Sequence, residues 1–175
     1  MKKITFFAAI AMIAFTTNVV AQSTAEDFAV TNATVIAPIT ITKTVDMSFG
    51  NLVSTVLGGD VNLPTSGART GDVDILLGSD NGTVTAASFD ITGEANYSYG
   101  ITLPSTFTVG DGAATTENTM SVGTFVSLPA ATGSGTLSAT GTQTLLVGAT
   151  ITLGATQTAG DYTNTTGMTV TVFYN

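Results

Sequence analysis

The chain has 175 residues, of which 43% are hydrophobic and only 9% are charged. Histidine and cysteine are absent, which excludes Ser-His-Asp and Cys-His catalysis and leaves only carboxylates for any zinc site. The twelve acidic residues outnumber the four basic ones. Because negative charge repels phosphate backbones, we expect no nucleic-acid partner.

The N-terminus has the three-part layout of a secretory signal peptide, residues 1–21. Two lysines follow the first methionine, residues 4–15 form a nearly unbroken apolar run, and a small residue stands at Ala21. The apolar run is too short to span the roughly 30 Å of hydrocarbon in a bilayer. We therefore expect cleavage before Gln22 and an exported protein of one domain, residues 22–175, without an integral membrane segment. Its destination would be the periplasm, the cell surface or the medium.

The rest of the chain is rich in threonine, valine and glycine, which favours strands over helices. Apolar residues alternate with polar ones, or form short runs, in segments that we predict as strands: 33–41, 45–49, 61–63, 73–77, 84–91, 97–103, 120–128, 145–153 and 168–174. Asp80-Asn81-Gly82 predicts a hairpin turn between two of these strands. Segments 109–118 and 130–135 are predicted loops. Roughly eight to ten strands with frequent turns indicate an all-β sandwich or barrel.

The register of the apolar residues changes near the start of this pattern. Phe28 and Val30 occupy even positions, whereas the apolar residues of segment 33–41 occupy odd ones. A one-residue slip sends side chains to the opposite face of a strand. Two interpretations remain open: residues 22–31 form a separate N-terminal arm, or a bulge interrupts one long strand.

Carboxylates are the side chains that could carry catalysis or bind a metal ion in this chain. Asp72 and Asp74 would share one face of a strand, and a glycosidase needs two acids at a set separation, but the chain has no tryptophan to grip a sugar. Asp80 and Asn81 add oxygen atoms suited to calcium, although their spacing does not match the twelve-residue calcium loop and a turn already explains them. We therefore expect no catalytic residue, no cofactor and no metal site, and a protein that is not an enzyme.

The last predicted strand runs to the end of the chain, with Tyr174 as the penultimate residue. An exposed strand edge recruits other strands through its unpaired backbone groups. Val170, Val172 and Tyr174 are thus candidates for a receiving edge. The alternative is an ordinary closing strand of the sandwich.

Three stretches together resemble a known family: residues 36–42 leading to 47–50, residues 96–104, and residues 147–153 followed by 160–162 and 170–175. They are similar to the secreted bacterial family known only as domain of unknown function four-four-zero-two. The resemblance supplies no activity, cofactor or catalytic residue. It implies a distant similarity to spore-coat-U and chaperone–usher pilin domains, which are immunoglobulin-like antiparallel β-sandwiches completed by a neighbour's N-terminal arm. The absent disulfide and the position of Gly160 depart from the pilin pattern.

These observations predict a non-catalytic surface subunit of a Gram-negative bacterium, fimbria-like or coat-like, that self-associates by strand exchange. The assembly candidates are Phe28 and Val30 on the arm, and Val170, Val172 and Tyr174 on the receiving edge. A periplasmic chaperone is a candidate partner. The alternative is a monomeric module that binds a glycan or a protein through the predicted loops 109–118 and 130–135, since loops on a rigid scaffold commonly carry recognition.

Overall fold

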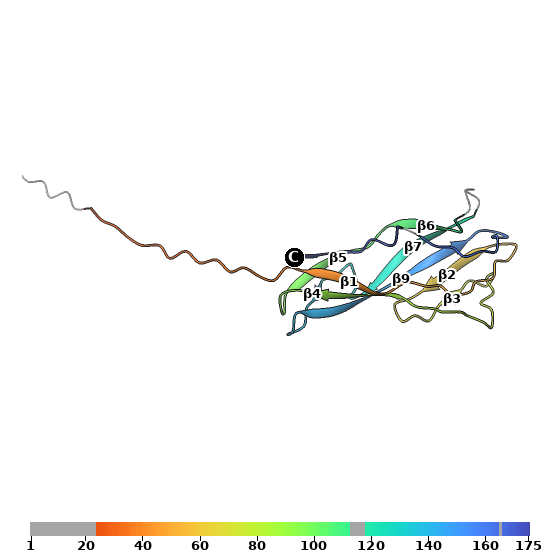
Figure 1. Ribbon diagram of the computed structural model, residues 1–175, viewed down its shortest axis with the longest axis horizontal. Coiled ribbons are helices and arrows are strands. Elements are labelled where there is room, and N and C mark those ends of the chain that lie inside the picture. Colours follow the sequence, from red (N-terminus) through yellow and green to blue (C-terminus); the bar gives the residue numbers. More distant parts are fainter. Residues whose placement is uncertain (1–23, 113–117, 165) are drawn as a thin grey trace, which may run out of the picture. The chain divides into compact units, whose positions relative to one another are not determined.

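The structure is a computed structural model that describes residues 24–112, 118–164 and 166–175. The expected signal peptide therefore lies outside the described residues. Ten strands and no helix occur in the described chain (Figure 1), and all the strand pairs between them are antiparallel. The predicted all-β antiparallel architecture is thereby confirmed. No helix that could cross a membrane occurs in the described part of the chain.

The strands form a seven-stranded and a three-stranded sheet. Their bounds are β1 Thr40–Val45, β2 Gly59–Leu63, β3 Thr70–Gly71, β4 Ala87–Thr92, β5 Ser98–Thr102, β6 Thr106–Gly110, β7 Thr119–Leu128, β8 Gly135–Thr136, β9 Thr142–Leu153 and β10 Thr171–Tyr174. β9 is the centre of the large sheet, because it pairs with β4, β2 and β7. The small sheet has the order β10-β5-β8.

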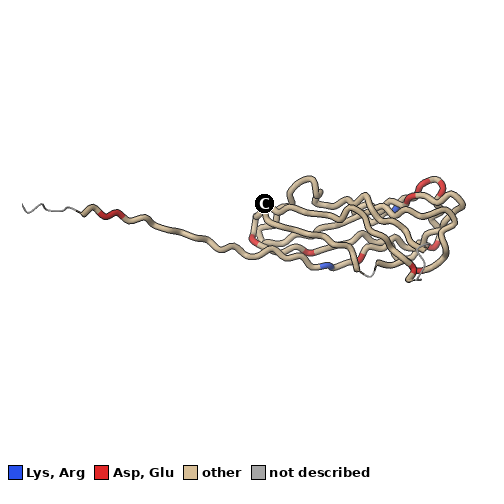
Figure 2. Tube along the Cα trace, turned by 90° about the horizontal axis from the view of Figure 1, so that it is seen from above, with Lys and Arg blue, Asp and Glu red and all other residues tan. Residues whose placement is uncertain are grey.

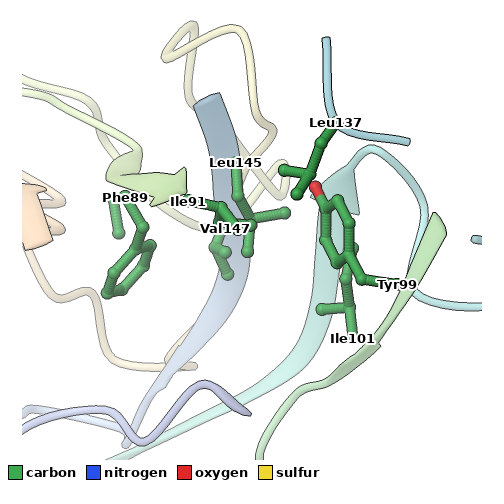
Figure 3. Packing of buried hydrophobic residues seen from close by; sticks show 8 residues of the cluster. Phe89, Ile91, Tyr99, Ile101, Leu137, Leu145 and Val147 are labelled. Carbon is green, nitrogen blue, oxygen red and sulfur yellow. The ribbon is translucent and has the colours of Figure 1, made fainter. Parts of the chain in front are cut away.

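The two sheets pack face to face around a buried apolar cluster. Leu145 of β9, Ile91 of β4 and Tyr99 of β5 are fully buried there, and Figure 3 shows the β5 side chains facing those of the large sheet. The Tyr99 hydroxyl donates a hydrogen bond of 3.2 Å to Oε1 of Gln143. Burial raises the pKa of the Tyr99 phenol. The packing of these side chains confirms the predicted alternation in segments 97–103 and 145–153.

A second apolar cluster lies at the other end of the large sheet. It contains Val61 of β2, Val122 of β7 and Ile151 of β9, all buried. The partly buried side chains packed against it come mainly from β6 and from irregular segments: Met47, Phe49, Leu52, Phe107, Val109, Phe125 and Tyr162. This end of the sheet is therefore covered mostly by loops and not by the three-stranded sheet.

The start of the chain differs from the predicted strand 33–41. No strand occurs in residues 24–39, and β1 begins only at Thr40, two residues after Pro38. Proline has no N–H to donate to a ladder, so it delays the start of pairing. Phe28, Val30 and Val35 are 85–95% exposed. Residues 24–39 are thus not one bulged strand, and an arm over residues 22–31 stays a prediction.

The predicted buried strand 73–77 and the hairpin after it are wrong. Val73 is 97% exposed, and Ile75 is the buried residue of this segment. The N–H of Ile75 donates to the Asp72 carbonyl oxygen, so the chain turns here instead of extending. β4, the strand expected to return beside this segment, pairs with β1 and β9.

The predicted loop 109–118 also begins too early in the sequence, because residues 109 and 110 belong to β6. β6 forms a hairpin with β7, in which Phe107 lies opposite Val122 and Val109 opposite Met120. The alternation in β6 covers only five residues and begins two residues after Pro104, which makes it a weak sequence signal. Residues 113–117 of the predicted loop lie outside the described residues.

Candidate functional site

The first and last strands of the sandwich, β1 and β10, belong to different sheets and do not pair with each other. We call the boundary between these two strands, and between the segments that continue them, the seam. The C-terminal segment runs along two consecutive strands, because Thr163 bridges to Gly110 of β6 and β10 pairs with β5. On the other side of the seam, β1 pairs with β4, and Ser48 bridges to Thr85 beyond it. β1 and β10 lie close together. Neither has a second strand partner among the described residues, so their free edges border the seam.

Tyr174 closes one end of the seam. Its hydroxyl accepts a hydrogen bond from the Glu94 N–H at 2.6 Å and donates one to the Ala37 carbonyl oxygen at 2.8 Å. The Ala37 N–H in turn donates to Oε2 of Glu94 at 2.9 Å. A Cβ at position 93 would stand against the Tyr174 hydroxyl, so Gly93 leaves the room that this arrangement needs. Three segments far apart in the sequence are joined here by one side chain.

Ser54 closes the other end. Its hydroxyl donates to the Gly154 carbonyl oxygen at 3.1 Å and accepts from the Gln157 N–H at 2.9 Å. The Thr156 N–H also donates to the Thr55 carbonyl oxygen. The chain that leaves β9 is thereby fixed to the chain that follows β1.

An apolar groove of about 1310 Å³ opens between these two ends, and we call it the seam groove. One wall consists of residues 43–54, and the other of residues 157–164 with Gly167 and Met168. The floor is formed by apolar side chains of the large sheet: Ala87, Phe89, Phe107, Val109, Met120, Val122, Ile151 and Leu153. Away from the closed ends, no backbone hydrogen bond joins the described residues of the two walls.

β10 presents backbone groups to the seam and side chains to the core. The Asn175 N–H donates to the Ser98 carbonyl oxygen on β5. Because bonding alternates along an antiparallel pair, the backbone groups of Val172 and Tyr174 point away from β5. The side chains of Val170, Val172 and Tyr174 pack against the first apolar cluster. The structure thus brings the predicted edge residues together, but an incoming strand would contact their backbone and not their side chains.

Two of the carboxylates considered as candidates, Asp72 and Asp80, have structural partners. Asp72 accepts a hydrogen bond from the Asp60 N–H at 3.1 Å, and Asp80 accepts one from the Gly82 N–H at 3.2 Å. Within the described residues, no group of three or more acidic side chains gathers in a way that could hold a metal ion. Asp72 and Asp80 therefore serve to shape loops.

Sequence reasoning did not foresee the seam groove itself. Its walls are irregular segments, and a pattern search for strands gives such segments no role. The alternation of Val45, Met47 and Phe49 could have indicated the groove. It marks an apolar face that continues past Val45, where β1 ends. Met47 and Phe49 line the groove.

Tyr174→Phe is expected to lower the free energy of unfolding by about 1–2 kcal/mol, because two hydrogen bonds to backbone groups are lost. Urea denaturation would measure the change. Tyr97→Phe is the matched control, since Tyr97 packs edge-on against Tyr174 and its hydroxyl takes part in no described hydrogen bond. Equal losses in the two variants would contradict the assigned role of the Tyr174 hydroxyl.

The fold and the groove define the class of this protein: an antiparallel two-sheet β-sandwich with an apolar seam open between its first and last strands. Residues 39–174 match the family described as Domain of unknown function (DUF4402), and the chain belongs to that family. The match covers the sandwich strands and both walls of the seam groove. No curated protein and no solved structure shows a significant match to the chain.

Proposed function

We propose that this protein is an exported, non-catalytic structural subunit of a fimbria-like or coat-like surface assembly, and that its copies associate through β-strand pairing. One observation carries the proposal: the seam groove between residues 43–54 and residues 157–168 is open and has an apolar floor. The signal-peptide pattern of residues 1–21 supports the exported location.

The seam groove offers both things that strand addition needs. An added strand requires unpaired backbone groups along an edge and pockets for alternate side chains. β10, which follows the groove wall along the chain, has free backbone groups at Val172 and Tyr174, and the groove floor presents apolar side chains. Met120 and Val122 of the floor are less than 10% exposed, so the walls overhang them. Since no backbone hydrogen bond joins the walls along the groove, parting the walls breaks none.

The N-terminal segment has the properties of a strand without a sheet. Phe28 and Val30 are two residues apart, so they lie on one face when the chain is extended. Both are at least 85% exposed, and residues 24–34 form no strand. Exposed large apolar side chains mark interaction sites when they gather. We therefore assign to this segment the role of the strand that a neighbouring copy receives.

The composition supports a non-catalytic role. Without histidine or cysteine, the nucleophiles and general bases of most hydrolases are missing. Within the described residues, the acidic positions fall on several separate segments of the chain (Figure 2), and no three of their side chains gather in a way that could hold a metal ion. Strand pairing needs only backbone groups and apolar side chains, which this chain has in excess.

The double substitution Phe28→Asp with Val30→Asp in the full chain tests this proposal. We expect oligomers of the wild type, seen by light scattering and negative-stain microscopy, to be lost, because two charges cannot enter an apolar groove. The melting temperature of the monomeric sandwich should stay unchanged, since both side chains are at least 85% exposed.

The control places the same two charges on the opposite face of the extended segment, as Ala29→Asp with Thr31→Asp. This control should still assemble. If the wild type is a stable monomer at high concentration, strand association is wrong, and the monomeric binding module predicted as the alternative becomes the better description.

A further inference from the structure

We infer that the N-terminal segment of a second copy enters the seam groove in one direction only, with Glu26 placed against Lys43. This inference rests on the proposed strand association and adds the direction and register of the incoming strand. It follows from where the charges of the groove and of the segment lie.

Lys43 marks one end of the groove. It lies opposite Phe89 in the β1–β4 pair and lines the groove. Ser54 and Gln157 bound the opposite end. The two ends of the groove therefore differ in charge: Lys43 and its partner Asp46 lie at the end nearer β1, whereas Asp161 lies toward the far end, where Gly110 of β6 bridges to Thr163.

Among the residues that the structure describes, Lys43 is the one cation available to an incoming strand in the groove. Beyond residues 1–21, the basic residues of the chain are Lys43 and Arg69. The Arg69 guanidinium is occupied with holding a loop, because it donates to the Phe49 carbonyl oxygen and to Oδ1 of Asn81. Lys43 pairs with Asp46 at 2.6 Å, but both side chains are more than half exposed. Exposed pairs of this kind contribute little, so the ammonium group can take a second carboxylate.

The N-terminal segment carries its charge on one side of its apolar residues. Glu26, Phe28 and Val30 share one face of an extended chain, whereas Asp27 points to the other. With Glu26 at Lys43, Phe28 and Val30 follow over the apolar floor. In the reverse direction, Glu26 would lie toward Asp161, which is near the far end of the groove beside the end of β6, and like charges repel.

The lengths agree with this placement. The floor follows β9 from the level of Leu145, which pairs with Phe89, to Leu153. At 3.3 Å per residue this is about 26 Å, the length of a strand of about eight residues. A strand that starts at Glu26 reaches the far end near residue 33. It would run parallel to residues 43–54 and antiparallel to the C-terminal segment that leads into β10.

A charge exchange tests the direction. The receiving protein is the full chain with Phe28→Asp and Val30→Asp, whose own segment is disabled, and the probe is a labelled peptide of residues 24–36. We expect Lys43→Glu in the receiver to weaken binding of the wild-type peptide about tenfold, measured by fluorescence anisotropy at low salt. The Glu26→Lys peptide should bind the Lys43→Glu receiver about as well as the wild-type pair bind each other. The Asp27→Lys peptide should retain the selectivity of the wild-type peptide, because Asp27 lies on the opposite face.

The outcomes separate this inference from the proposal on which it rests. If the wild-type peptide binds but Lys43→Glu changes nothing, or if Glu26→Lys does not restore binding, the direction is wrong and strand association stands. If the exchange at Asp27 restores binding in place of the exchange at Glu26, the register is wrong by one residue. If the wild-type peptide does not bind at all, both the direction and the association are overturned.

Discussion

Replacing Leu145 with alanine is expected to lower the free energy of unfolding by about 2–5 kcal/mol. The Leu145 side chain is fully buried between the two sheets, where it belongs to the same cluster as Ile91 and Tyr99 (Figure 3). Truncation removes buried methyl groups and leaves a cavity that strands on both sides hold open. The measurement is chemical denaturation of the purified chain.

The matched control is Leu76→Ala. Leu76 is 62% exposed, so the same chemical change there should alter stability by no more than about 0.5 kcal/mol. This pair of variants also tests the corrected position of segment 73–77, which the sequence pattern predicts as a buried strand. A loss at Leu76 as large as that at Leu145 would contradict the fold described here.

Replacing Gly148 with alanine should be the second strongly destabilising change, by roughly 1–3 kcal/mol. Gly148 is buried in β9 beneath the chain that leaves β2. A Cβ there would stand against the Leu63 carbonyl oxygen and 2.8 Å from the carbonyl carbon of Pro64. These are backbone atoms, so no side-chain rotation can relieve the contact. The unfolding midpoint should fall, and β2 would have to shift away from β9.

Gly133→Ala is the control for that substitution. The nearest atom to a Cβ at position 133 is the Ala130 carbonyl oxygen at 3.6 Å, an ordinary contact. With no clash, the smaller conformational freedom of the unfolded chain should leave stability unchanged or raise it by up to about 1 kcal/mol. The expectation would be contradicted if Gly133→Ala lowered the stability of the protein while Gly148→Ala left it at the wild-type value.

The elements that sequence reasoning predicts correctly are those with long, clean alternation. β9 shows an apolar residue at every second position from Leu145 to Leu153, and all of these are buried. The segment 73–77 is equally apolar, but a local hydrogen bond between Ile75 and Asp72 turns the chain there. Hydrophobicity alone cannot distinguish a buried strand from an apolar loop, because the difference lies in contacts with distant residues.

The candidate site was only partly predictable for the same reason. The free edge at Val172 and Tyr174 follows from an alternating strand at the chain end, and the structure places both residues in β10. The groove walls come from irregular segments that meet through contacts such as Ser54 with Gln157, about a hundred residues apart. The position of Lys43 at the groove becomes apparent only when the two walls are placed together, since its local sequence is that of an ordinary exposed strand residue.

The central place of β9 has a consequence for how the chain acquires its structure. β9 hydrogen-bonds to β2, β4 and β7, and it begins only at Thr142. Every one of those earlier strands lacks its partner β9 until about the last fifth of the chain is available. Contacts this distant in sequence must first bear the entropy of closing long loops, which makes folding slow. We therefore expect the large sheet to stay incomplete until residues 142–153 have emerged from the ribosome, and a chain without its central strand offers less resistance to threading through a narrow translocation pore.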